Sequence, residues 1–100
     1  MKLREVACGR SGDKGAHANI GIAAYTPEGY ALIEETLTPE RVAAHFAQLK
    51  PRRVKRYALP NLLAFNFVLE GVLEGGGNRS LRSDAQGKAL AQALLEIEIG

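Results

Sequence analysis

The chain has a single cysteine, no tryptophan and a formal net charge of only +2 over 100 residues. One cysteine cannot close an internal disulfide, hold an iron–sulfur cluster or build a cysteine-rich zinc site. The two histidines, His17 and His45, stand far apart and lack the spacing of a metal motif, so we predict neither a metal nor another cofactor. The small net charge does not by itself point to a strongly charged partner.

Long apolar runs are also missing. The N-terminal residues carry frequent charges and lack the apolar run of a signal peptide. The longest mostly apolar stretch, Leu62 to Leu73, is interrupted by Asn66, Glu70 and Gly71 and is too short and too polar to span a bilayer. We therefore expect a cytoplasmic protein that has no membrane partner.

Apolar residues make up 46% of the chain, which is enough to build the core of one domain over residues 1–100. A short strand is predicted from Leu3 to Cys8. A clearer alternation predicts a second strand from Ala18 to Tyr25, with one apolar face. Gly21 and Ala23 leave the other face of that strand thin, so we expect a closely packed element to cover it.

Two Thr-Pro-Glu triplets predict the beginnings of two helices. In each triplet the threonine suits the N-cap, proline suits the first helical position, and glutamate suits the first turn. The first helix is expected from Pro27 to Glu35. The second is expected from Pro39 to Leu49, where Pro51 prevents its continuation.

The second half of the chain is predicted as strand, helix, strand and helix. Arg53 to Leu59 has charges on both faces, which is typical of an edge strand. A helix is predicted from Pro60 to the glycines at 75–77, with Asn61 as its cap. Its expected buried stripe is Phe65, Val68, Leu69 and Val72.

A fourth strand from Arg79 to Ser83 and a last helix from Ala85 to Ile97 complete the prediction. Ser83 or Asp84 is expected to cap this helix, with Leu90, Leu94 and Ile97 facing inward. The predicted fold class is α+β, a single four-stranded sheet with helices packed mainly on one face.

The segment from Arg10 to Gly21 is the main candidate site. We expect a loop in which glycines with positive φ turn the backbone so that several N–H groups face a carboxylate or phosphate. The candidate anion-binding residues are Ser11, Gly12, Asp13, Lys14, Gly15 and Asn19. One competing interpretation is a plain connection between two strands with Lys14 in solvent. Another is catalysis by a buried Lys14, with His17 as an acid–base group.

A second glycine-rich loop offers the candidates Gly76, Gly77, Asn78 and Arg79. Arginine beside a glycine turn suits bidentate binding of a carboxylate or phosphate. The alternative is a helix end followed by an edge strand with solvated charges, and the sequence favours this simpler interpretation.

The run from Lys50 to Arg56 holds five cations in seven residues. Nucleic-acid binding is one interpretation, but Tyr57 is the only neighbouring aromatic and no RNA-recognition motif is present. A charged edge strand that resists aggregation explains the run more simply, so we expect no nucleic-acid partner.

A series of motifs along the chain resembles the small C-terminal ferredoxin-like domain of the acyclic terpene utilisation protein A family. In order, they are Gly12-Asp13-Lys14-Gly15, Asn19-Ile20-Gly21, Leu59-Pro60-Asn61-Leu62, Phe65-Asn66-Phe67-Val68-Leu69, Gly75-Gly76-Gly77, Ser80-Leu81-Arg82-Ser83-Asp84 and Gly87-Lys88. The resemblance implies a ferredoxin-like α+β sandwich, a link to acyl-CoA or branched-chain carbon metabolism, and a much larger partner domain. It carries over no catalytic residues.

The expected function is that of an accessory subunit or assembly domain associated with a larger protein of this family. Open sheet edges and the largely apolar strand from Ala18 to Tyr25 also predict a homo-oligomer. The alternative is a small stand-alone enzyme or anion-binding protein that acts on an acyl or carboxylate metabolite through Lys14, Asp13 and His17.

Overall fold

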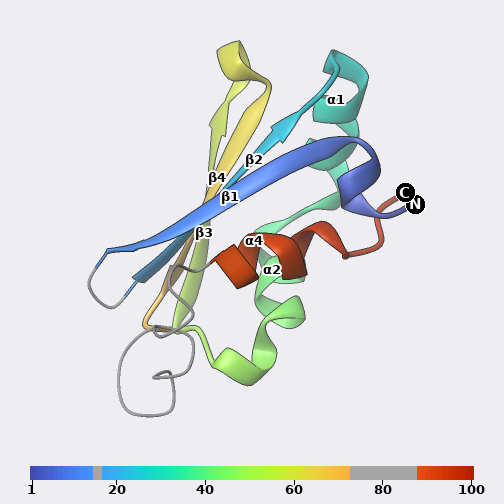
Figure 1. Ribbon diagram of the computed structural model, residues 1–100. Coiled ribbons are helices and arrows are strands. Elements are labelled where there is room, and N and C mark those ends of the chain that lie inside the picture. Colours follow the sequence, from blue (N-terminus) through green and yellow to red (C-terminus); the bar gives the residue numbers. More distant parts are fainter. Residues whose placement is uncertain (15–16, 73–87) are drawn as a thin grey trace.

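The computed structural model describes residues 1–14, 17–72 and 88–100, with residues 13, 14, 88 and 89 described for their backbone alone (Figure 1). The described residues form a four-stranded antiparallel sheet in the order β1-β2-β4-β3. The helices lie against one face of this sheet (Figure 1). The predicted α+β class, with one four-stranded sheet and helices mainly on one face, is therefore confirmed.

The elements follow one another along the chain with short connections. The strands are β1 (Ala7–Lys14), β2 (His17–Ala24), β3 (Arg53–Leu59) and β4 (Ala64–Glu70). The helices are α1 (Pro27–Thr36), α2 (Pro39–His45) and α4 (Lys88–Leu95). Three short 3-10 turns are η1 (Leu3–Glu5), η2 (Ala47–Leu49) and η3 (Pro60–Leu62).

The core lies between the helices and the two central strands. Along β2 every second residue is buried, from Ala18 to Ala24, as the alternation in the sequence predicted. The register places Phe67 of β4 beside Ile20 and Phe65 beside Ile22, and all four side chains are almost completely buried. Burial of apolar surface between helices and sheet is the main force that stabilises this layer arrangement.

Both predicted helix beginnings are confirmed. The Thr26 hydroxyl accepts a hydrogen bond from the backbone N–H of Gly29 at 3.0 Å, and the Thr38 hydroxyl accepts one from Arg41 at 3.2 Å. These bonds satisfy backbone donors that the first helical turn leaves without a partner. Helix α2 ends at His45, earlier than predicted, and η2 continues the chain to Leu49.

The helix predicted from Pro60 is wrong. Only η3 forms at Pro60, and the chain then enters β4, a central strand between β2 and β3. Phe65, Phe67 and Leu69 are buried with a period of two, while Val68 faces the other way and is half-buried. Pairing with strands on both sides satisfies the backbone N–H and C=O groups of this segment. The helix was predicted from the apolar pattern alone, and that pattern does not include pairing with distant strands.

The strand predicted from Leu3 to Cys8 begins later and runs further. Leu3–Glu5 form η1, in which the Glu5 carboxylate accepts a 2.8 Å hydrogen bond from the Lys2 backbone N–H. Strand β1 starts at Ala7 and continues to Lys14, through the first part of the segment expected to be a loop.

The edge position of β3 is confirmed by the strand order. Helix α4 confirms the last predicted helix from Lys88 onward, and Leu90, Leu94 and Ile97 are buried as expected. The predicted glycine stop at 75–77, the strand from Arg79 to Ser83 and the cap at Ser83 or Asp84 lie outside the described residues.

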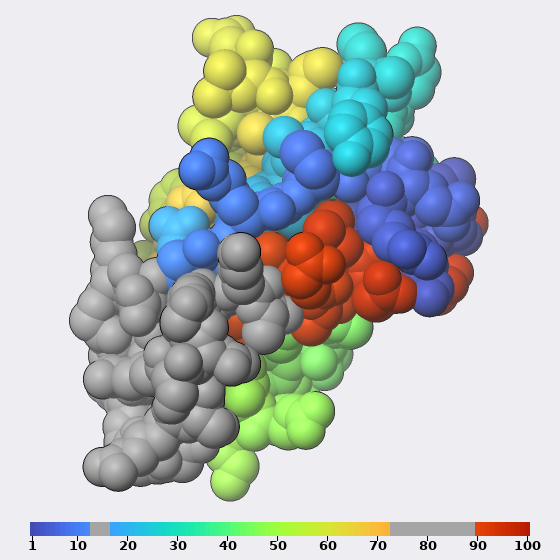
Figure 2. Space-filling model, in the orientation of Figure 1, coloured from blue at the N-terminus to red at the C-terminus, as the bar shows by residue number. Residues whose placement is uncertain are grey.

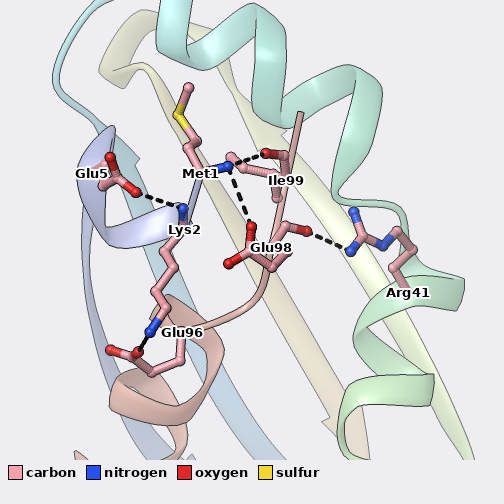
Figure 3. A network of polar contacts seen from close by, with 7 residues as sticks. All are labelled: Met1, Lys2, Glu5, Arg41, Glu96, Glu98 and Ile99. Carbon is pink, nitrogen blue, oxygen red and sulfur yellow. Dashed lines mark hydrogen bonds and ion pairs between the residues drawn. The ribbon is translucent and has the colours of Figure 1, made fainter.

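The two ends of the chain lie side by side (Figures 1 and 2). The Leu3 N–H donates to the Ile97 carbonyl at 2.9 Å, and the Ile99 N–H donates to the Met1 carbonyl at 2.8 Å. Arg41 of α2 donates to the Glu98 carbonyl at 2.6 Å, which joins the C-terminal segment to the helical layer (Figure 3). The two backbone bonds and the Arg41 side-chain bond hold the last residues against the same core as the helices.

Candidate functional site

The segment expected to form the anion-binding loop is mostly a β-hairpin. Ser11 pairs with Ile20 and Gly12 pairs with Asn19, so only residues 15–16 lie between β1 and β2. Gly12 is part of extended strand and does not have the positive φ that the loop prediction required. The predicted extent of the loop is therefore wrong, because cross-strand hydrogen bonds keep this segment extended.

Strand alternation separates the candidate residues of this segment. Ser11 lies on the helix-covered face, where its hydroxyl accepts a 3.3 Å hydrogen bond from the Ala91 N–H of α4. Gly12 and Asn19 lie on the opposite face and are half-buried. An anion site that uses Ser11 and Asn19 together would need both faces of the sheet, so the structure does not bring these two residues together.

The remaining candidates stay predictions. The backbone of Asp13 pairs with Ala18 and that of Lys14 with His17, and Gly15 lies outside the described residues. The second-loop candidates, Gly76, Gly77, Asn78 and Arg79, also lie outside the part of the chain that the structure describes.

His17 makes a structural contact at the end of the sheet. Its Nδ1 accepts a hydrogen bond of 3.2 Å from the backbone N–H of Gly71, directly after β4. Gly71 has φ of +85°, a left-handed conformation that glycine adopts at little cost. The imidazole therefore stabilises a tight backbone turn, and the acid–base role considered for it gains no support from this geometry.

An acidic residue surrounded by cations lies beside His17. The Glu70 carboxylate is 3.1 Å from Arg53 and 3.6 Å from Lys55. The hydrogen bond from Arg53 lowers the pKa of Glu70, the charges of Arg53, Lys55 and His17 lower it further, and partial desolvation opposes them. Two cations of the basic run thus bind an acidic partner within the sheet.

The face of the sheet away from the helices, here called the open face, is formed by successive rows of residues across the four strands. The first row is Cys8, Ala23, Ala64 and Leu59, and the second is Arg10, Gly21, Asn66 and Tyr57. The third row is Gly12, Asn19, Val68 and Lys55. The open face is therefore mostly apolar at its first row and becomes polar and charged towards Glu70.

A groove of about 390 Å³ lies over the first two rows. The floor of the groove lies close to the backbone of β2, because Gly21 has no side chain there and that of Ala23 is small. Tyr57 and Leu59 rise along one side, with 48% and 42% of their surfaces exposed, and Cys8 and Arg10 stand on the other. The thin face noted in the sequence is thus not covered by any described element; it forms a groove.

The polar groups of the groove share one row. The Arg10 side chain is exposed and has no ion pair or hydrogen bond to another side chain within the described residues. Asn66 lies two strands away in the same row and supplies an amide. No aspartate or glutamate of the described part of the chain lines the groove. The groove can therefore hold an apolar group beside a single positive charge.

Sequence reasoning missed this groove. Its residues come from four separate segments, and only the register of β1, β2, β4 and β3 aligns them. The one feature of the sequence that points to the groove is the pair of small residues, Gly21 and Ala23, on the face of β2 away from the core.

In the described ranges, no group of three His, Cys, Asp or Glu side chains is placed to hold a metal ion. None of the described helices has the length and apolar character required to cross a lipid bilayer.

Comparisons with curated proteins, solved structures and family models bear on the relationships of this chain. No curated protein and no solved structure matches this chain. The family model of the AtuA ferredoxin-like domain matches residues 1–100, the whole chain, in agreement with the resemblance in the sequence motifs and with the α+β fold. The chain belongs to the AtuA ferredoxin-like domain family.

Proposed function

We propose that this protein is an accessory or assembly domain that binds a larger polypeptide of the acyclic terpene utilisation type, acting in acyl-CoA or branched-chain carbon metabolism. Family membership supports the association with this type of protein. The structural observation that carries the proposal is a group of exposed large apolar side chains at one end of the sheet.

These side chains are Tyr25, Leu59 and Leu62, here called the apolar tip. Their exposed fractions are 62%, 42% and 68%. All three belong to the same end of the sheet: the Ala24 N–H donates to the Leu63 carbonyl at 2.8 Å, which joins the end of β2, just before Tyr25, to the turn between β3 and β4 that holds Leu62. Grouped exposed apolar residues are typical of surfaces that another polypeptide covers.

Binding to the larger polypeptide is testable by substitutions in the apolar tip. Tyr25→Ser and Leu62→Ser remove apolar contact area without touching the buried core, so the melting temperature should stay close to that of the parent. Both variants should bind a larger polypeptide of the family more weakly than the parent does. We expect the dissociation constant to rise roughly tenfold or more, and less of the co-expressed larger polypeptide to co-purify. Gln92→Ser, on the exposed face of α4, is the polar control.

Co-elution of the Tyr25→Ser, Leu62→Ser double variant at parental affinity would show that the tip is not the contact. Separate elution of the two parental polypeptides would count against the accessory role itself.

We also propose that the protein self-associates, with a dimer as the expected state. No described strand pairs with the outer edge of β1 or of β3. An unpaired strand edge is a template for pairing with a second copy, which would extend the sheet. Light scattering at micromolar concentration should give the mass of a dimer, and a mass of one chain throughout the concentration series would contradict self-association.

A further inference from the structure

We propose that the groove on the open face is a binding site for a small amphipathic monocarboxylate, a molecule with one apolar body and one carboxylate head. This site goes beyond the proposed assembly role. It is formed by the first two rows of the open face, and of the apolar tip only Leu59 lines it, while Tyr25 and Leu62 do not.

The size and lining of the groove suit a small molecule. Its volume of about 390 Å³ lies within the range of roughly 300–1,000 Å³ that is common for ligand pockets. Such pockets are mostly apolar, with a few convergent polar groups that orient the ligand. The first row supplies the apolar part through Ala23, Ala64 and Leu59, and the second row supplies the polar part.

The charge of the groove selects an anion. Among the described residues, Arg10 is the only charged one that lines the groove, and its guanidinium has no carboxylate partner there. Arginine binds a carboxylate through two parallel N–H···O bonds, which fixes the orientation of the head group. The Asn66 amide, in the same row, can donate a further hydrogen bond. The body of the ligand then lies over the small residues of β2.

Gly21 provides a direct way to close the groove. A Cβ added there would have the Arg10 carbonyl oxygen, at 3.9 Å, as its nearest contact, which is an ordinary separation. Its backbone also lacks a positive φ, so Gly21→Val should fold while its side chain fills the floor of the groove. Gly12→Val is the matched control. It places the same side chain on the same face, where a Cβ has no atom within 4 Å, but outside the groove.

The probes are octanoate, octanol and octylammonium, which share one apolar body and differ in the charge of the head. Binding is followed by the backbone amide shifts of groove residues and by the alkylation rate of Cys8. This residue is the only cysteine of the chain and lies exposed in the first row. We expect octanoate to bind saturably and to slow alkylation, octanol to bind about tenfold more weakly, and octylammonium to bind least.

Two variants of the protein distinguish binding of the ligand's apolar body from binding of its carboxylate head. Arg10→Met, which keeps an apolar side chain, should lower octanoate affinity about tenfold and leave octanol affinity unchanged. Gly21→Val should abolish binding of both ligands, while Gly12→Val should bind as the parent does. These measurements use the chain alone, so their failure is distinguishable from failure of the assembly proposal.

Three results would overturn the inference. The first is the absence of saturable octanoate binding by the parent. The second is equal affinity for the three probes, and the third is parental octanoate binding by Gly21→Val. If Gly21→Val does not fold, Arg10→Met decides instead, since unchanged octanoate affinity in that variant removes the proposed head-group site.

Discussion

The guanidinium carbon of Arg56 lies 5.0 Å from the ring centroid of Phe65, over the aromatic face. Tyr30 of α1 also stacks on Phe65, with ring centroids 4.6 Å apart and planes at 8°. The same Arg56 donates hydrogen bonds to the carbonyls of Glu34 and Leu37, at 3.0 and 2.9 Å. A cation from the basic run on β3 therefore satisfies carbonyl groups at the end of α1 and holds the helix against the sheet.

Replacing Arg56 should destabilise the protein. Arg56→Ala removes two charge-assisted hydrogen bonds and the cation–π contact, so the free energy of unfolding should fall by about 1–3 kcal/mol. Arg56→Lys should retain part of this stabilisation, because an ammonium reaches fewer acceptors. Urea denaturation measures both. Lys55→Ala is the neighbouring control, as its exposed pair with Glu70 should contribute little. Equal midpoints for Arg56→Ala and the parent would disprove this role.

Truncating Leu94 should create a cavity between α4 and the sheet. Its side chain is completely buried in the cluster that also contains Phe65 and Leu69. Leu94→Ala should therefore cost about 2–5 kcal/mol of unfolding free energy, depending on how far the neighbours relax. Thermal and denaturant unfolding monitored by circular dichroism check this. The control Gln92→Ala, at an exposed position of the same helix, should keep the parental free energy of unfolding. If Leu94→Ala melted as the parent does, the burial of this face of α4 against the sheet would be contradicted.

Two glycines of β1 should respond differently to the same substitution. A Cβ at Gly9 would lie 2.8 Å from the Ile22 Cδ1 atom and 3.2 Å from the Gly21 carbonyl oxygen. Gly9→Val should therefore force neighbouring atoms apart and cost roughly 1–3 kcal/mol. A Cβ at Gly12 has no atom within 4 Å, so Gly12→Val should leave the melting temperature unchanged or higher. Equal losses in both variants would contradict the close approach at Gly9.

Acid should weaken the folded protein through two carboxylates. A hydrogen bond from Arg53 lowers the pKa of Glu70, and one from Lys2 lowers that of Glu96, relative to the ordinary 4.5. A carboxyl whose pKa is lower in the folded state stabilises the fold above its unfolded pKa. This contribution is lost as the pH falls below 4.5 through the folded value.

The Glu70→Gln, Glu96→Gln double variant should show a smaller drop in melting temperature between pH 7 and the acid range than the parent does. Melting curves over a pH series measure this. Its melting temperature at pH 7 should be only slightly lower, because both pairs are at the surface. Parallel acid profiles for parent and variant would exclude these two groups as the cause.

Local chemistry explains what could be predicted along the chain. Thr26 and Thr38 begin helices because each hydroxyl reaches a donor three residues away, and that contact depends on neighbours in sequence alone. The buried alternation of β2 was likewise visible, since one side of a strand repeats every second residue. The family resemblance rested on ordered motifs, and the match over residues 1–100 confirms it.

Long-range pairing decided the rest. The apolar residues at 65, 68, 69 and 72 have the spacing of a helix, whereas those at 65, 67 and 69 have the spacing of a strand. Pairing with β2 on one side and β3 on the other selects the strand, β4. The hairpin of β1 and β2 similarly replaced the expected loop at Gly12. The groove exists because four strands align Arg10, Gly21, Asn66 and Tyr57 in one row. The amino-acid sequence by itself determined helix caps, strand alternation and family. The tertiary structure alone decided β4 and the groove, because both depend on hydrogen bonds between segments far apart in the chain.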